Sequence, residues 1–102
     1  MLRFITLSTA LLATPALAGI VPSEARFADG TSAPARIIVN DAIWRCEGAR
    51  CVGRNEDRPV MIARACKLLA RQVGALSALT VGTKVLDATE LAACNEKARN
   101  AQ

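Results

Sequence analysis

Four cysteines are the residues in this sequence whose type and spacing could support chemistry. Cys46 and Cys51 are separated by four residues, whereas Cys66 and Cys94 stand alone in the second half of the chain. Thiol–disulfide exchange usually requires a C-x-x-C motif at the start of a helix, where the thiol pKa is depressed. A four-cysteine zinc site normally consists of two close pairs. We therefore expect structural disulfides and no metal or other cofactor, with exchange through Cys46 and Cys51 as the alternative.

The chain contains no histidine and no tyrosine. The absence of histidine removes the commonest general base and excludes a Ser-His-Asp or Cys-His mechanism within this chain. Acidic side chains at Asp41, Glu47, Glu56 and Asp57 could include an acid–base pair, but nothing in the sequence places two of them across a cleft. We therefore expect a protein that is not an enzyme.

Basic residues gather in the middle of the chain and could form a face that binds phosphate, lipopolysaccharide or nucleic acid. The alternative is a solvated rim balanced by nearby acidic residues. Nucleic acid would require aromatic stacking platforms, and only Phe27 and Trp44 follow residue 18, so no nucleic-acid partner is expected. Trp44 belongs either to this face or to the core. The candidate face consists of Trp44, Arg45, Arg50, Arg54, Arg58, Arg64, Lys67 and Arg71.

Residues 1–18 have the pattern of a secretory signal peptide. A basic start precedes an apolar run at residues 4–13 and the A-x-A motif of Ala16-Leu17-Ala18. We expect cleavage between Ala18 and Gly19. The apolar run is about ten residues, while a spanning helix needs roughly 20, so the mature chain is expected to have no membrane span. Removal of this segment leaves 12 basic against 9 acidic residues. The predicted location is periplasmic or secreted.

Residues 35–54 are predicted to form strands. Three β-branched residues at 37–39 precede Asn40-Asp41, which suits a two-residue hairpin turn. A second turn is expected at Gly48-Ala49, and it would bring two cysteines within disulfide reach. The expected cross-strand pairs are Ile38 with Ile43, Ile37 with Trp44, Glu47 with Arg50, and Cys46 with Cys51.

Residues 60–73 have the periodicity of an amphipathic helix. Apolar residues recur on one face, with Cys66 among them, and Gly74 suits the position after the last turn. Residues 76–86 then suggest two short strands around a Gly-Thr turn. The preceding stretch of residues 19–34 contains prolines, a glycine and small polar residues, so we expect an irregular lead there.

The last helix is expected over residues 88–99. Asp87, followed by Glu90 three residues later, fits a capping box at its start. Cys94 lies on the apolar face of this helix, as Cys66 does on the other helix. Two buried thiols that face one core in an oxidising compartment should form a disulfide.

These elements predict a small, disulfide-stapled α+β domain over residues 35–102. An antiparallel sheet from residues 35–54 and 76–86 would be covered on one face by the two helices. In a mature chain of about 84 residues, burial alone gives only marginal stability, so further constraints are expected. The disulfides Cys46–Cys51 and Cys66–Cys94 are expected to supply them.

Three segments resemble a family of small exported proteins from alphaproteobacteria whose members are uncharacterised. The likeness covers residues 35–95. It implies export and a four-cysteine pattern, and it brings no activity, ligand or catalytic residue. The segments are Ala35 to Cys46 with Cys51 and Gly53 after it, Ala65 to Gly74, and Leu86-Asp87 followed by Leu91 to Asn95.

The sequence as a whole favours a non-catalytic exported domain whose partner is an unknown protein or an anionic component of the cell envelope. Its contact surface would include the arginine-rich hairpin and the neighbouring helix face. The alternative is a periplasmic thiol–disulfide exchange protein that uses Cys46 and Cys51. A redox pair should be reduced by glutathione while the fold survives, whereas a structural pair should resist reduction.

Overall fold

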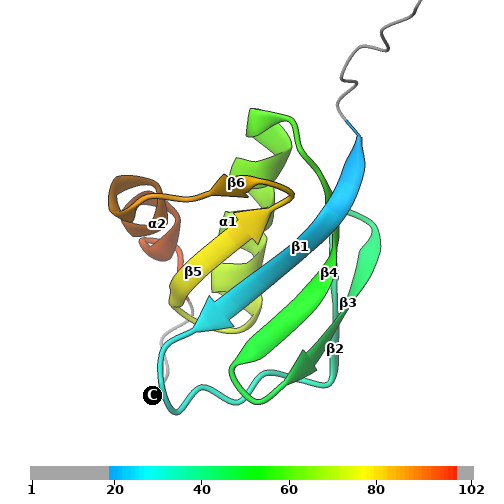
Figure 1. Cartoon of the computed structure of the whole chain (residues 1–102). Coiled ribbons are helices and arrows are strands. Elements are labelled where there is room, and N and C mark those ends of the chain that lie inside the picture. The colour runs from blue at the N-terminus through cyan, green and yellow to red at the C-terminus, as the bar shows by residue number, and fades with distance from the viewer. Residues whose placement is uncertain (1–18, 99–102) are drawn as a thin grey trace, which may run out of the picture.

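Residues 19–98 are described by the computed structural model, and they form a six-stranded antiparallel sheet with two helices on one face (Figure 1). Across the sheet the strands follow the order β2-β3-β4-β1-β5-β6. The expected α+β class, with both helices on one face, is confirmed. The elements are β1 (Ile20–Phe27), β2 (Arg36–Val39), β3 (Ala42–Glu47), β4 (Arg50–Glu56), α1 (Pro59–Gln72), β5 (Leu76–Val81), β6 (Lys84–Val85) and α2 (Ala88–Asn95).

Two tight hairpins build β2, β3 and β4. Asn40 and Asp41 have φ angles of 52° and 67°, the left-handed conformation that a two-residue turn of type I′ requires and that Asn and Asp tolerate. This turn pairs Ile38 with Ile43, as expected. The second turn likewise brings Cys46 directly opposite Cys51. The predicted register of both hairpins is therefore confirmed.

The expectation of an irregular lead over residues 19–34 is wrong for its first half. Strand β1 occupies that segment and lies in the middle of the sheet, between β4 and β5, so the folded domain begins at Gly19 and not at residue 35. Only the connection at residues 28–34 is irregular. The alternating side chains that point toward the helices include small and polar residues, which gave little strand signal. They are Val21, Ser23, Ala25 and Phe27.

Pro22 is an unusual residue for a central strand, because proline cannot donate a ladder hydrogen bond. Its carbonyl accepts a hydrogen bond from the Gly82 N–H at 2.9 Å, so its backbone polar groups point toward the β5 side. Pairing with β5 begins only at Ser23, opposite Val81. The missing N–H of Pro22 therefore removes no bond from the β1–β4 ladder.

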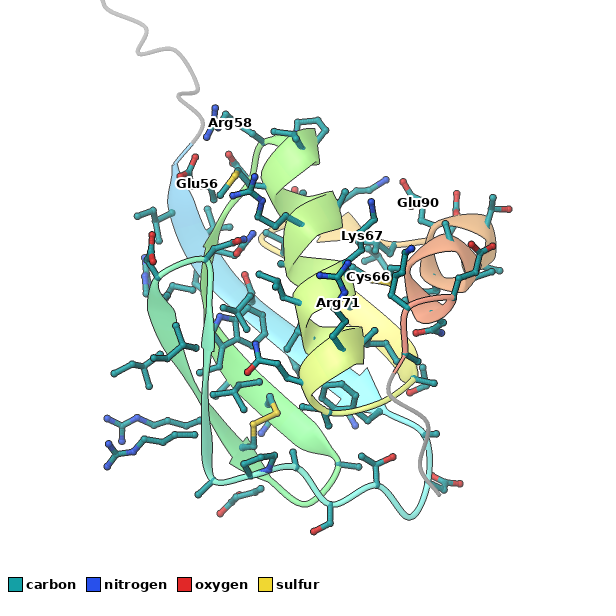
Figure 2. The ribbon with its side chains drawn as sticks, turned by 180° about the vertical axis from the view of Figure 1, so that it is seen from behind. Glu56, Arg58, Cys66, Lys67, Arg71 and Glu90 are labelled. Atoms are coloured by element: carbon teal, nitrogen blue, oxygen red, sulfur yellow. A yellow bond between two sulfur atoms is a disulfide. The ribbon has the colours of Figure 1, made fainter. Side chains whose placement is uncertain are left out.

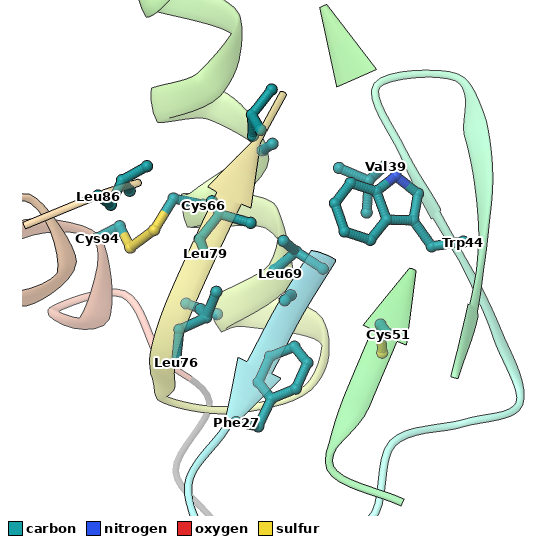
Figure 3. Packing of buried hydrophobic residues seen from close by; sticks show 14 of the residues in the cluster. Phe27, Val39, Trp44, Cys51, Cys66, Leu69, Leu76, Leu79, Leu86 and Cys94 are labelled. Carbon is teal, nitrogen blue, oxygen red and sulfur yellow. A yellow bond between two sulfur atoms is a disulfide. The ribbon is translucent and has the colours of Figure 1, made fainter. Parts of the chain in front are cut away.

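The core lies between the sheet and α1. Trp44 is fully buried and lies beside Val39, Leu69 and the other apolar side chains of the core (Figure 3). The helix begins at Pro59, which suits the first helical position, and the glycine after its last turn has a φ of 149°. The buried face of α1 consists of Ile62, Ala65, Cys66, Leu69 and Ala70.

The second helix begins at the predicted capping box and ends earlier than expected. The Glu90 N–H donates to Asp87 Oδ1 and the Asp87 N–H to Glu90 Oε1, both at 2.8 Å. The helix ends at Asn95, whose side chain bonds the backbone of Leu76: Oδ1 accepts at 2.8 Å and Nδ2 donates at 2.9 Å. The expected end at Arg99 lies outside the described residues.

Candidate functional site

Both expected disulfides are present. Cys46–Cys51 joins β3 to β4 across a Cα–Cα distance of 4.0 Å, and Cys66–Cys94 joins α1 to α2 across 5.7 Å. Figure 3 shows the second bond lying between the two helices, beside Leu86. Each disulfide therefore links two elements that also pack against each other.

The sulfurs are poorly placed for thiol–disulfide exchange. Cys51 is fully buried, Cys46 is 9% exposed, and Cys66 and Cys94 are 1% and 3% exposed. Exchange requires an attacking thiolate to reach a sulfur, so labile disulfides are accessible ones. Burial of all four residues favours a structural role for both bonds over catalysis by Cys46 and Cys51.

The predicted basic face is divided between two sides of the molecule. Arg45, Arg50 and Arg54 alternate with inward-facing residues of β3 and β4, so they project from the face of the sheet that carries no helix. Lys67 and Arg71 lie on the outer surface of α1, in the opposite layer (Figure 2). The two groups cannot contact one flat partner together.

Trp44 was a candidate for this face, and the structure places it elsewhere. Its side chain points into the core and is 0% exposed, on the same strand face as Cys46. Trp44 and Ile37 pair across the hairpin and both point inward. The residues next to them along the strands, Arg45 and Arg36, therefore point outward. The core alternative for Trp44 is therefore the correct one.

Several of the predicted arginines already have partners. Arg50 donates from Nε to Glu24 Oε2 at 2.7 Å, and Arg26 lies 3.0 Å from the same oxygen. This hydrogen bond from Arg50, and the charge of Arg26, hold the pKa of Glu24 below its ordinary value. Arg58, just before α1, pairs with Glu56 at 2.7 Å. These carboxylates reduce the charge that a ligand would meet.

On the open sheet face, Arg54 donates from Nη2 to the Ile20 carbonyl at 3.0 Å, whereas Arg36 and Arg45 are not held in this way by any described residue. They lie directly opposite each other across β2 and β3, and both are exposed. Within residues 19–98, no carboxylate forms an ion pair with either one. Arg36 was missed by the sequence reasoning, although the predicted register that sets Ile37 opposite Trp44 also sets Arg36 opposite Arg45.

The two arginines have apolar neighbours on the same face. Ile38 and Ile43 form the next outward-facing pair, and they are 62% and 55% exposed. A shallow hollow of about 510 Å³ lies beside Ile43, lined in part by Glu24, Arg45 and Arg54. We call Arg36, Ile38, Ile43 and Arg45 the open-face patch.

The basic residues of α1 border a different groove. Arg64, Lys67 and Arg71 are spaced along one side of the helix and line a groove of about 720 Å³, which Asp41 of the first hairpin turn and Ile38 of the edge strand β2 also border. Arg71 lies in the last turn of α1, where a cation interacts favourably with the negative end of the helix dipole. This stripe has the features of a solvated helix face.

A third hollow, of about 620 Å³, lies between α1 and α2 over the Cys66–Cys94 disulfide. Its lining is largely apolar and includes Ile62 and Leu86. The Lys84 ammonium and the Glu90 carboxylate at its rim pair with each other at 3.1 Å. The groove thus presents apolar surface rather than an unpaired charge from Lys84 or Glu90.

A known protein family matches most of the chain. The model of a family of unknown function (DUF8200) matches residues 7–96, which span every strand and helix described above. The chain belongs to this family. No curated protein and no solved structure matches the chain. Among residues 19–98 of this chain, no helix is both long and apolar enough to cross a membrane.

Proposed function

We propose that this DUF8200 protein is an exported, non-catalytic domain that binds the anionic lipid surface of the cell envelope through its open-face patch. The observation that carries the proposal is the pairing of Arg36 with Arg45. Like charges directly opposite each other destabilise a sheet. A phosphate group between the two guanidiniums would remove that repulsion, because arginine binds phosphate through two parallel hydrogen bonds.

The apolar half of the patch favours a lipid surface over a free anion. Ile38 and Ile43 together offer branched side chains that reach beyond the sheet, next to the two arginines. At a membrane interface, apolar side chains enter the acyl boundary while basic residues stay at the phosphates. The patch combines both features on one uncovered sheet face.

Export is part of this proposal. Residues 1–18 carry the signal-peptide pattern and lie outside the described residues. Two buried disulfides in a domain this small are compatible with an oxidising compartment. The resemblance to exported alphaproteobacterial proteins supports the same location.

The test is sedimentation of the purified protein with vesicles. We expect binding to vesicles that contain phosphatidylglycerol, little binding to pure phosphatidylcholine, and a steep loss of binding with salt. Arg36→Gln combined with Arg45→Gln should weaken binding roughly 30-fold, since each basic residue near an anionic surface contributes about 1 kcal/mol.

The matched control is Arg64→Gln combined with Arg71→Gln, which removes the same charge from the helix layer. This control should bind nearly as well as the unmodified protein. Equal loss in the two double variants would indicate a general charge effect and would contradict the assignment to the open-face patch. Binding that does not respond to salt, or that fails on anionic vesicles, would refute the lipid proposal.

A further inference from the structure

The start of β1 is held by a reciprocal pair of hydrogen bonds. The backbone nitrogen of Gly19 donates to Asp57 Oδ1 at 2.9 Å, and the Asp57 N–H donates to the Gly19 carbonyl at 3.0 Å. The next residues, Ile20 and Glu56, form the first pair of the β1–β4 ladder. Asp57 therefore anchors the end of the central strand to the turn that leads into α1.

The same nitrogen is the one that signal-peptide cleavage would release. Ala16 and Ala18 form the A-x-A motif, so the bond expected to be cut joins Ala18 to Gly19. The A-x-A motif thus predicts a free amino group at the nitrogen that Asp57 binds in the fold.

We propose that cleavage at Ala18–Gly19 creates an α-ammonium that forms an ion pair with Asp57 and so strengthens the attachment of β1 to the turn before α1. Water hydrolyses the peptide bond: its hydroxyl adds to the Ala18 carbonyl carbon, and its proton goes to the Gly19 nitrogen. At neutral pH the products are a carboxylate on Ala18 and an ammonium on Gly19. A neutral amide donor in the precursor thereby becomes a charged donor at the same carboxylate.

The surroundings of Asp57 suit this role. Its carboxylate has no other ion-pair partner within residues 19–98, because Arg58 is paired with Glu56 and Lys84 with Glu90. The N-cap residue of α1 is Arg58, and the Asp57 side chain, one residue before it, accepts its hydrogen bond from Gly19. Gly19 and Asp57 are both partly buried, and partial burial reduces screening by salt.

The test uses the full chain, expressed with its own leader and recovered from the periplasm. Intact mass should show a polypeptide that begins at Gly19 and is four hydrogens lighter than the fully reduced chain. A second variant carries one additional serine between Ala18 and Gly19, which leaves the cleavage motif unchanged. Processing then yields Ser-Gly19, in which the nitrogen facing Asp57 is again a neutral amide and the charge is displaced.

Asp57→Asn is then made in both backgrounds, and thermal midpoints are compared. The substitution should lower the midpoint by about 4 °C more in the natural mature chain than in the serine-extended chain. Equal effects in the two backgrounds, or a mass that places the N-terminus elsewhere, would overturn the proposal. If Asp57→Asn does not accumulate, the serine insertion alone must lower the midpoint, and equal midpoints would overturn it.

This inference shares only the export of the chain with the proposed function. A mature N-terminus at Gly19 that pairs with Asp57 is compatible with failure on vesicles, since Asp57 is not part of the open-face patch. Conversely, binding to anionic vesicles says nothing about the charge on Gly19. Failure of one experiment therefore does not imply failure of the other.

Discussion

At the scale of single residues, the contact between Trp44 and Gly53 determines where the indole lies on the sheet. The indole is fully buried and lies over Gly53 of the neighbouring strand. A Cβ atom at Gly53 would overlap the ring carbons of Trp44. The absence of a side chain at this position is therefore what allows the largest core residue to lie flat against β4.

Replacement of Gly53 by alanine should destabilise the domain. The added methyl must displace the indole or the strand, and overpacking of this kind typically costs about 1–3 kcal/mol. Urea unfolding followed by Trp44 fluorescence measures the loss. In a Trp44→Leu background, followed by circular dichroism, the same substitution should cost less, because leucine leaves room for the methyl group. An equal cost in both backgrounds would show that the ring contact is not the cause.

Glu24 controls how much positive charge the open sheet face presents. Arg50 and Arg26 hold the pKa of Glu24 below its ordinary value, so this carboxylate remains charged over most of the pH range. We expect Glu24→Gln to strengthen binding to anionic vesicles at pH 7, because it removes a negative charge and releases two guanidiniums. Glu90→Gln, which releases Lys84 in the helix layer, is the matched control and should have little effect.

The same ion pairs make a pH-dependent contribution to stability. Because the pKa of Glu24 is lower in the folded state, its contribution is present above the ordinary value of 4.5 and is lost as the pH falls through the folded pKa. The difference in unfolding midpoint between the unmodified protein and Glu24→Gln should therefore be constant near neutral pH and disappear in acid. A difference that grows in acid would contradict this assignment.

At the scale of elements, local signals predicted both hairpins and the starts of both helices. The turn at Asn40-Asp41 and the box of Asp87 with Glu90 depend on neighbouring residues only, so the sequence is sufficient for them. Strand β1 depends on partners about 25 to 60 residues away, and its inward side chains include small and polar residues. No local pattern could reveal that this segment lies in the middle of the sheet.

The sequence predicted Arg45 of the candidate site but not its pairing with Arg36, because this pairing also depends on how the strands associate. The run of arginines in the sequence crosses from the sheet to α1, and the fold sends its two halves to opposite layers. Arg36 precedes that run and joins it only through the pairing of β2 with β3. Register, rather than proximity along the chain, determines which charges meet.

Asn95 connects α2 to β5 and gives a prediction at this scale. Its amide makes two hydrogen bonds to the backbone of Leu76, which is itself buried. Asn95→Ala would leave that N–H and carbonyl without these partners, and we expect a loss of about 1–3 kcal/mol. The change is measured by urea unfolding, with the exposed Ser77→Ala as a control. An unchanged free energy of unfolding would mean that water replaces the hydrogen bonds of the Asn95 amide.

At the scale of the whole molecule, the fold is two layers with one sheet face left uncovered (Figure 1). The helices and the disulfide Cys66–Cys94 close the other face. Such a small domain gains limited stability from burial alone, so we expect the covalent link between the helices to contribute substantially to its stability. The uncovered face is thereby free to display the open-face patch.

Removal of the disulfide that closes the longer loop, Cys66–Cys94, should destabilise the domain more than removal of Cys46–Cys51. Loop-closure entropy assigns about 3.5 kcal/mol to Cys66–Cys94 and about 2 kcal/mol to Cys46–Cys51, since the first closes the longer loop. Paired serine substitutions at each bridge, compared by thermal unfolding, measure the two contributions. Greater stability after loss of Cys66–Cys94 than after loss of Cys46–Cys51 would contradict this order.

The most direct test of the binding account is a map of amide chemical shifts in the ¹⁵N-labelled mature protein, recorded with and without bicelles that contain phosphatidylglycerol. The account predicts that the largest salt-sensitive changes fall on β2 and β3, around Arg36, Ile38, Ile43 and Arg45. Changes confined to the outer surface of α1, or a spectrum that the anionic bicelles leave unaltered, would contradict it.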